Sequence, residues 1–411
     1  MFTPAARSAT IEVVTSNVFF IAALIVIVSV IVTLTFLRFR VQVVRPQAYE
    51  RQPDPGSYTI IKYVEVAPFN RRSSSLSDQS YDWRQAMRTL GRRLVEADVG
   101  AITLAHGTFV GNDPLSVASF IGRLLPGFGA TAEGLLIGFA KLQSDLVMGD
   151  NGNFLPEYVE LMREALGGTV PCRMFNWGSG NHHLHRLQGA VRLAIRLASA
   201  RQINGASCHR HLIFGHSHAG QMFAILTQLL GHSRDAAALI DIARLSGEDV
   251  APLPNALREL RKLALDFVTL GTPPRYGWGD FPRYRLLNIV NHRGAEPFAG
   301  TWQGLLHTLH GDYVQQWGIA GSDLLAGSQS DRELNTRLNA ILGEGFNPKA
   351  WLENARYLVR VPSHGHTYLV DYDDASRLIA NCFPTVFGHG IYTKRTVMLF
   401  NLQLAVDHFY L

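Results

Sequence analysis

Along most of the chain, the pattern of hydrophobic and polar positions changes from block to block, which is typical of a chain in which helices and strands alternate. Apolar residues recur at the three- and four-residue spacing of one-sided helices in four segments: 83–97, 132–146, 184–200 and 219–231. Short, continuously apolar runs predict strands that are covered on both faces; these are 58–66, 100–109, 169–177, 211–217, 263–273, 284–291 and 355–362. This alternation predicts an α/β fold with a doubly wound, mostly parallel sheet.

One apolar segment, 18–37, differs from the others because it contains no charged residue, proline or glycine. About 20 residues at a rise of 1.5 Å span the roughly 30 Å core of a bilayer. The run is too long for a signal peptide, and no small-residue cleavage site follows it, so a retained transmembrane helix is predicted. Arg7 is the only basic residue before the segment, whereas four arginines follow between positions 38 and 51. The excess of positive charge predicts a cytoplasmic C-terminal part.

These features divide the chain into a short N-terminal segment (1–17), a transmembrane helix (18–37), a basic, proline-containing linker (38–57) and one large domain (58–411). The 411 residues are 47% hydrophobic, which excludes a disordered or fibrous protein. The arginines of the linker alone supply four positive charges toward the net charge of +5, and no basic stripe interleaved with aromatics is present, so no nucleic-acid partner is expected. Three cysteines without a CxxC motif predict free thiols in a reducing compartment.

The segment GHSHA, Gly215 to Ala219, lies where a predicted strand gives way to a predicted helix. Small residues two positions before and after Ser217 allow strand and helix to pass closely, while a strained backbone raises the hydroxyl above the sheet. The following helix directs its amino end at an oxyanion formed there. Ser217 is therefore predicted to be a nucleophile; an ordinary strand-to-helix turn is the structural alternative.

This turn resembles the nucleophile elbow of the α/β-hydrolase superfamily, in particular its lipase-like members with a GHSHGG turn, although Ala219 stands where glycine is usual. Three more stretches are similar to segments of those lipases: AHGTF (105–109), NWGSGN with the arginine-bearing helix after it (176–186), and VTLGTPPRYG (268–277). The resemblance covers roughly residues 100–372. It implies an α/β-hydrolase domain with a Ser-His-acid triad.

In that superfamily the triad follows the chain order serine, acid, histidine. His366, after the last predicted strand, is the expected base, and His364 is the alternative. Asp312 is the expected acid, because GDYVQQWG resembles the acid segment of the lipases. Asp323 and then Glu296 are the alternative acids. The carboxylate is needed to hold the tautomer of the base.

The resemblance also implies an oxyanion hole that combines the backbone N–H of His218 with one from the His-Gly loop, at Thr108 or Gly107. The side chains of His216 and His218 are expected to pack beside the turn or to line the pocket. The resulting hypothesis is a membrane-anchored serine esterase or lipase that acts through an acyl-enzyme on a lipid-like ester, with its site tethered near the bilayer. It needs neither a cofactor nor a metal.

Two other functions fit parts of the sequence. GDNGN (149–153), GNHH (180–183) and GHSH (215–218) resemble, in order, the ligand motifs of metallophosphoesterases, which bind two metal ions. The opening D-x-H pair of those enzymes is missing, however, and GNHH lacks their acidic residue. The second alternative is a membrane-tethered interaction module that keeps a hydrolase shell without activity.

Overall fold

The computed structural model describes residues 58–62, 70–72, 79–107, 152, 154–178, 180–204, 209–231, 235–292, 311–319, 321, 323, 328–345, 358–362, 364–372 and 388–411. The chain divides into two compact units, 1–52 and 53–411, and all of these residues belong to the second unit. The predicted transmembrane segment and the linker lie outside them. Within the described ranges, no helix is both long and apolar enough to cross a membrane.

Seven strands form a sheet in the order β2-β9-β7-β6-β5-β3-β4, and every neighbouring pair is parallel. The strands are β2 (Asn70–Arg72), β3 (Val99–Ala105), β4 (Cys172–Phe175), β5 (Arg210–His216), β6 (Ala264–Leu270), β7 (Tyr284–Asn291) and β9 (His366–Asp371). The central strands are buried along nearly their whole length, as their continuous apolar runs require. The predicted α/β fold with a mostly parallel sheet is confirmed.

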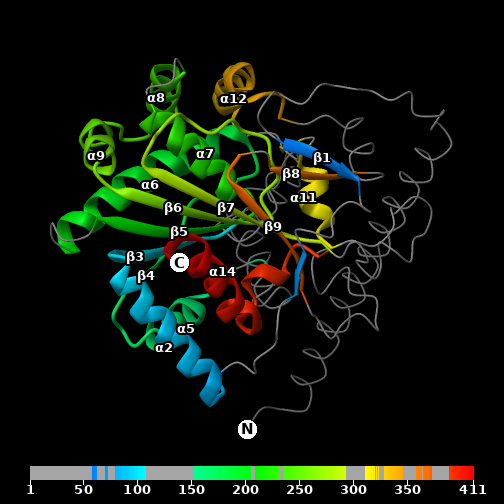
Figure 1. Cartoon of the computed structure of the whole chain (residues 1–411). Helices are drawn as coiled ribbons and strands as arrows, with labels where there is room; N and C mark the ends of the chain where they lie inside the picture. The colour runs from blue at the N-terminus through cyan, green and yellow to red at the C-terminus, as the bar shows by residue number, and fades with distance from the viewer. Residues whose placement is uncertain are drawn as a thin grey trace, which may run out of the picture. The chain divides into compact units, whose positions relative to one another are not determined.

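Helices cover both faces of this sheet (Figure 1). On one face lie α2 (Tyr81–Glu96), α5 (Pro156–Ala165) and α14 (Met398–Tyr410). On the other lie α6 (His183–Asn204), α7 (Ala219–Leu230), α8 (Ala236–Leu245), α9 (Leu253–Leu260) and α12 (Gln329–Leu342). The short helices α11 (Tyr313–Gly318), η5 (Ile391–Thr393) and η6 (Arg395–Val397) belong to connections. Because side chains alternate along a strand, Ile213 packs into one core and its neighbours Leu212 and Phe214 into the other.

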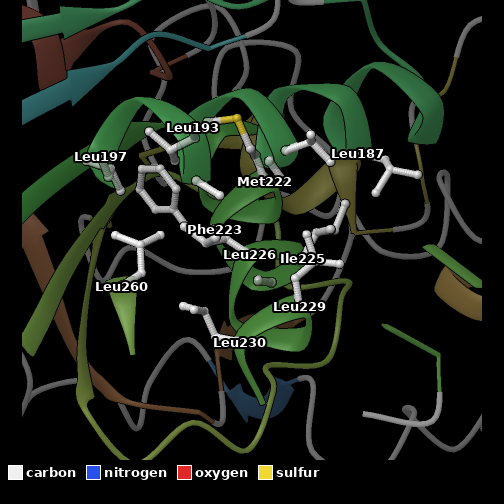
Figure 2. Close-up of a cluster of buried hydrophobic side chains, with 14 of the residues drawn as sticks. Leu187, Leu193, Leu197, Met222, Phe223, Ile225, Leu226, Leu229, Leu230 and Leu260 are labelled. Atoms are coloured by element: carbon white, nitrogen blue, oxygen red, sulfur yellow. The ribbon is translucent and has the colours of Figure 1, made fainter. Parts of the chain in front are cut away.

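Helix α7 forms the centre of the larger core, where it packs against α6 (Figure 2). Met222, Phe223 and Leu226 are fully buried between the two helices and the sheet. Burying each side chain of this size stabilises the fold by about 1.5–3 kcal/mol. The helix that follows the serine turn is therefore fixed by packing along its length, and this packing also restrains the turn.

A separate two-stranded sheet pairs β1 (Tyr58–Lys62) with β8 (Leu358–Pro362) in antiparallel register, Tyr58 opposite Pro362. Both segments were predicted as strands, and both are strands. They do not join the large sheet, however, whose last strand along the chain is β9. An apolar run indicates a strand but not the strand with which it pairs. Because the large sheet ends with β9 and not with β8, a histidine that follows the last strand of the sheet has to be sought after β9.

Candidate functional site

The serine turn has the strained backbone that its sequence predicts. Ser217 follows β5 directly and has a positive φ of 56°, which is unfavourable for a residue with a side chain. Its N–H donates to the carbonyl of Leu270 at 2.8 Å, and its carbonyl accepts from the Thr272 hydroxyl at 2.7 Å. Leu270 and Thr272 belong to the LGTP segment at the end of β6, so that segment holds the turn in its strained conformation.

Glycines allow the backbone to approach the turn closely. A Cβ atom on Gly107, just after β3, would lie 2.8 Å from Ser217 Cβ and 2.9 Å from His216 Nδ1, so only glycine fits there. The preceding His106 is fixed by Trp177, whose indole N–H donates to the His106 carbonyl at 2.8 Å. The His-Gly loop and the tryptophan of NWGSGN are thereby brought to Ser217. Thr108, the other expected oxyanion residue, lies outside the described residues.

The two histidines that flank Ser217 make different contacts. His216 Nε2 donates to the backbone carbonyl of His389 at 2.9 Å, and the two imidazole rings are 4.6 Å apart. His218 is the residue at the amino end of α7, and its Nδ1 lies 3.4 Å from Ser217 Oγ. His216, Ser217 and His218 are all buried. Burial lowers the pKa of both imidazoles well below the ordinary value, so both are neutral at pH 7.

Asp312 lies beyond the end of β7, where its backbone N–H donates to the carbonyl of Asn291 at 2.9 Å. Its carboxylate accepts three hydrogen bonds, each 2.8 Å long: from His389 Nδ1, from the Tyr392 hydroxyl and from the backbone N–H of Gln315. Asp312 and His389 are each 3% exposed. We call Asp312, His389, Tyr392 and Gln315 the Asp312 cluster.

His389 was not predicted as a site residue, yet it is the histidine that the structure pairs with Asp312. A carboxylate can only accept, so Nδ1 of His389 carries the proton and Nε2 is left as an acceptor. Nε2 is buried and has no hydrogen-bond partner among the described residues. The segment Gly388–Gly390 follows β9, the last strand of the large sheet. The sequence signal that could have found it is a histidine between two glycines beyond that strand.

The structure puts His366 and His364 elsewhere. His366 is the first residue of β9, is exposed, and stacks on His408 with ring centroids 4.8 Å apart. Three strand spacings of about 4.8 Å separate β9 from β5, which leaves His366 on the order of 14 Å to the side of Ser217. His364 Nε2 bonds the Tyr284 hydroxyl at 2.5 Å and is also exposed. Neither histidine has a described contact with Ser217 or Asp312.

The alternative acid Asp323 forms a second buried group, which we call the Asp323 cluster: Asp323, Arg186, Arg275, His183 and Tyr276. Its carboxylate lies 2.8 Å from Arg186, 3.3 Å from Arg275 and 3.4 Å from His183 Nε2. Arg186 also donates to the Tyr276 hydroxyl at 2.7 Å. The two guanidinium groups and His183 keep the pKa of Asp323 below its ordinary value despite burial. Glu296, the remaining alternative acid, lies outside the described residues.

The histidines of the metal hypothesis are dispersed. His183 bonds Tyr276 through Nδ1 and the carbonyl of Gly343 through Nε2, at 3.0 Å for the latter. His216 and His218 make the contacts given above. In the part of the chain that the structure describes, no group of three or more His, Cys, Asp or Glu residues could hold a metal ion. Of the GDNGN motif, only Gly152 lies within that part.

Comparisons of the chain with protein-family models, with curated protein sequences and with solved structures give no significant match. The fold and the site define an α/β protein with a strained serine turn beside a buried carboxylate–histidine pair at the carboxyl ends of parallel strands. The function has to be inferred from these residues.

Proposed function

We propose that the chain is a serine hydrolase of the α/β-hydrolase type, in which Ser217 is the nucleophile, His389 the base and Asp312 the acid. The observation that carries the proposal is the buried Asp312–His389 hydrogen bond of 2.8 Å next to a serine with a positive φ. The chain order is serine, acid, histidine, as in the superfamily that the serine turn resembles. His389 takes the role that the sequence suggested for His366.

The protonation states suit general base catalysis. Asp312 accepts the Nδ1 proton of His389, so Nε2 can take the proton of the serine hydroxyl, and the carboxylate stabilises the imidazolium that results. Ser217 Oγ, which faces His218 Nδ1 at 3.4 Å, turns to His389 Nε2 when a substrate binds. Such catalytic hydrogen bonds often tighten only in the complex with substrate.

The reaction that follows is acyl transfer. Ser217 Oγ attacks the carbonyl carbon of an ester, and the tetrahedral oxyanion accepts hydrogen bonds from the backbone N–H groups of His218 and Gly107. His389 then gives its proton to the leaving alcohol, which leaves an acyl group on Ser217. Water, activated by the same imidazole, releases the acid and restores the serine. No cofactor takes part.

The substrate class is a lipid-like ester. The predicted transmembrane segment at 18–37 would tether the site to a bilayer on its cytoplasmic side, where membrane lipids are the most abundant esters within reach. The resemblance of the serine turn, NWGSGN and LGTP segments to lipases supports the same class. We therefore propose a membrane-anchored esterase or lipase.

Labelling of the full-length protein with a fluorophosphonate probe tests this proposal. Wild type is expected to label, and Ser217→Ala to lose the label. His389→Ala and His366→Ala form a matched pair: the first should lower the labelling rate by about 10³-fold or more, and the second should leave it unchanged. EDTA should have no effect.

Three results would contradict the proposal. A His366→Ala variant that loses labelling while His389→Ala retains it would return the base to His366. Phosphodiester hydrolysis that survives Ser217→Ala and disappears with EDTA would favour the metallophosphoesterase hypothesis. A folded wild type that neither labels nor cleaves any ester would favour the interaction module.

A further inference from the structure

The two histidines beside Ser217 are equally buried, and His216 is the one with a described hydrogen bond to the segment that carries the proposed base. Its Nε2–H donates to the carbonyl of His389 at 2.9 Å, and its ring lies 4.6 Å from the His389 ring. His218 instead faces Ser217 Oγ. The residue just before the nucleophile is therefore bonded directly to the backbone of the proposed base.

The segment Gly388–Gly390 is held from several sides. Asn291, at the end of β7, donates through Nδ2 to the carbonyl of Gly388 at 2.9 Å. The N–H of Gly152 donates to the carbonyl of Gly390 at 3.1 Å. The His389 side chain is bonded to Asp312. Among these described contacts, the one from His216 is the only one that ties the segment to the strand that carries the nucleophile.

We propose that His216 is a positioning residue, which holds His389 in reach of Ser217 by donating a hydrogen bond to the His389 carbonyl. This inference rests on the proposed function, since it assigns His389 the role of base. His216 touches no reacting atom and acts through His389. A displacement of about 1 Å at a catalytic group can lower the rate by about 10²-fold, so a single backbone anchor of this kind can be worth that much.

The chemistry of the contact requires an uncharged donor of the right length. The His389 carbonyl can only accept, which fixes the Nε2–H tautomer of His216. Burial lowers the pKa of His216 well below its ordinary value, and the proximity of His389 lowers it further. His216 therefore stays neutral and adds no positive charge beside the imidazolium that forms on His389. Glutamine offers a neutral N–H at nearly the same distance from the backbone, whereas leucine offers none.

Three variants of the full-length protein test the proposal: His216→Leu, His216→Gln and His211→Leu. His211 is the matched control, because it is also a fully buried, neutral histidine on β5, but its described hydrogen bond is to Thr103 at 3.4 Å. For hydrolysis of a p-nitrophenyl ester, His216→Leu is expected to lower kcat by about 10- to 100-fold with little change in KM. His216→Gln should recover most of the loss, and His211→Leu should leave kcat near that of wild type.

Amide hydrogen exchange of the peptide that contains Gly388–Gly390 gives a second readout, which does not depend on activity. Exchange there should accelerate in His216→Leu, return toward wild type in His216→Gln and stay unchanged in His211→Leu. Unchanged kcat and exchange in His216→Leu would overturn the inference, as would a His216→Gln variant no better than His216→Leu or an equal loss of kcat in His211→Leu. If wild type shows no esterase activity, the proposed function fails, and the exchange rates alone decide whether His216 holds the segment.

Discussion

Among the residues that the structure describes, two buried aspartate–histidine pairs occur, and their surroundings differ. Asp312 accepts from His389 at 2.8 Å and otherwise from neutral donors, the Tyr392 hydroxyl and the Gln315 N–H. Asp323 lies 3.4 Å from His183 and is bound by the guanidinium groups of Arg186 and Arg275. In the Asp312 cluster one imidazole nitrogen has no described hydrogen-bond partner, whereas both nitrogens of His183 are occupied.

These surroundings make the Asp312–His389 pair suited to proton transfer and the Asp323–His183 pair suited to stabilising the fold. An imidazole serves as a base only where one nitrogen is left to accept a proton and a carboxylate stabilises the cation that forms. Two arginines satisfy the charge of Asp323 before any imidazolium can, and burial lowers the pKa of His183 to about 3. A buried aspartate next to a histidine is therefore insufficient evidence for a triad; the charge of the other neighbours decides.

Replacing each aspartate by asparagine should separate the two roles most strongly in the rate. Asp312→Asn is expected to lower kcat for ester hydrolysis by about 10⁴-fold, because the amide favours the wrong tautomer of His389. Asp323→Asn acts on no catalytic group, so its folded fraction should keep wild-type kcat. Steady-state kinetics, normalised to the amount of protein that a fluorophosphonate labels at saturation, gives both values. Near-wild-type kcat in Asp312→Asn would remove Asp312 from the triad.

The free energy of unfolding should rank the two variants in the opposite order, with the larger loss in Asp323→Asn. Asp323→Asn leaves two buried guanidinium groups without their carboxylate and is expected to cost about 3–5 kcal/mol. Asp312→Asn leaves no buried cation among the described residues and should cost less. Asp241→Asn, which breaks an exposed ion pair with Arg244, is the control and should change stability little. Urea denaturation measures all three, and equal losses in Asp312→Asn and Asp323→Asn would contradict the comparison.

The surroundings of the Asp323 cluster should also make the fold sensitive to acid. Burial, with the neighbouring His185, lowers the pKa of His182 from 6.5 to about 3. The unfolded chain therefore binds a proton near pH 6.5 that the folded chain refuses until about pH 3, so stability falls as the pH is lowered between these values. His182→Gln removes this contribution and should flatten the slope by about 1.4 kcal/mol per pH unit. Denaturation curves at several pH values test this, and an unchanged slope would contradict it.

The smallest expected effect concerns backbone strain at the serine turn: Ser217 has a positive φ of 56°, whereas no residue of the Asp323 cluster has a positive φ. Ser217→Gly should be more stable than Ser217→Ala by about 1 kcal/mol, because glycine relieves the left-handed conformation that alanine keeps. Both variants lack the nucleophile and should be inactive. Thermal or urea unfolding of the pair measures the difference, and a less stable glycine variant would argue against strain at the turn.

Much of the fold could be predicted from the chain alone. The apolar runs and helical spacings located the strands at 211–217 and 284–291 and the helix at 219–231 within a residue or two of β5, β7 and α7. Ser217 stands out for the same local reason, since the small residues around it lie within five positions. Asp312 could be selected by its resemblance to the lipase segment, although Asp323 remained an alternative because it also follows an apolar run and precedes a predicted helix.

The histidine that pairs with Asp312 could not be found in this way, because its position depends on which strand ends the sheet. The run at 355–362 looks like a last strand, yet it pairs with β1, and β9 takes that place. The sequence pattern selected His364 and His366, which lie close to that run, whereas the histidine that the structure pairs with Asp312 is His389. Pairing between segments about 300 residues apart leaves no mark within a short window of sequence.

The sequence by itself determined the central strands, the helix after the serine turn and the serine at a turn that needs small residues, because these follow from side-chain size and hydrophobic spacing over a few positions. Only the tertiary structure decided which carboxylate received two arginines, which received a histidine, and that the imidazole before Ser217 binds the backbone of His389. Charge pairing and hydrogen bonding depend on distances of about 3 Å between atoms that are far apart along the chain, and those distances exist only once the sheet is assembled.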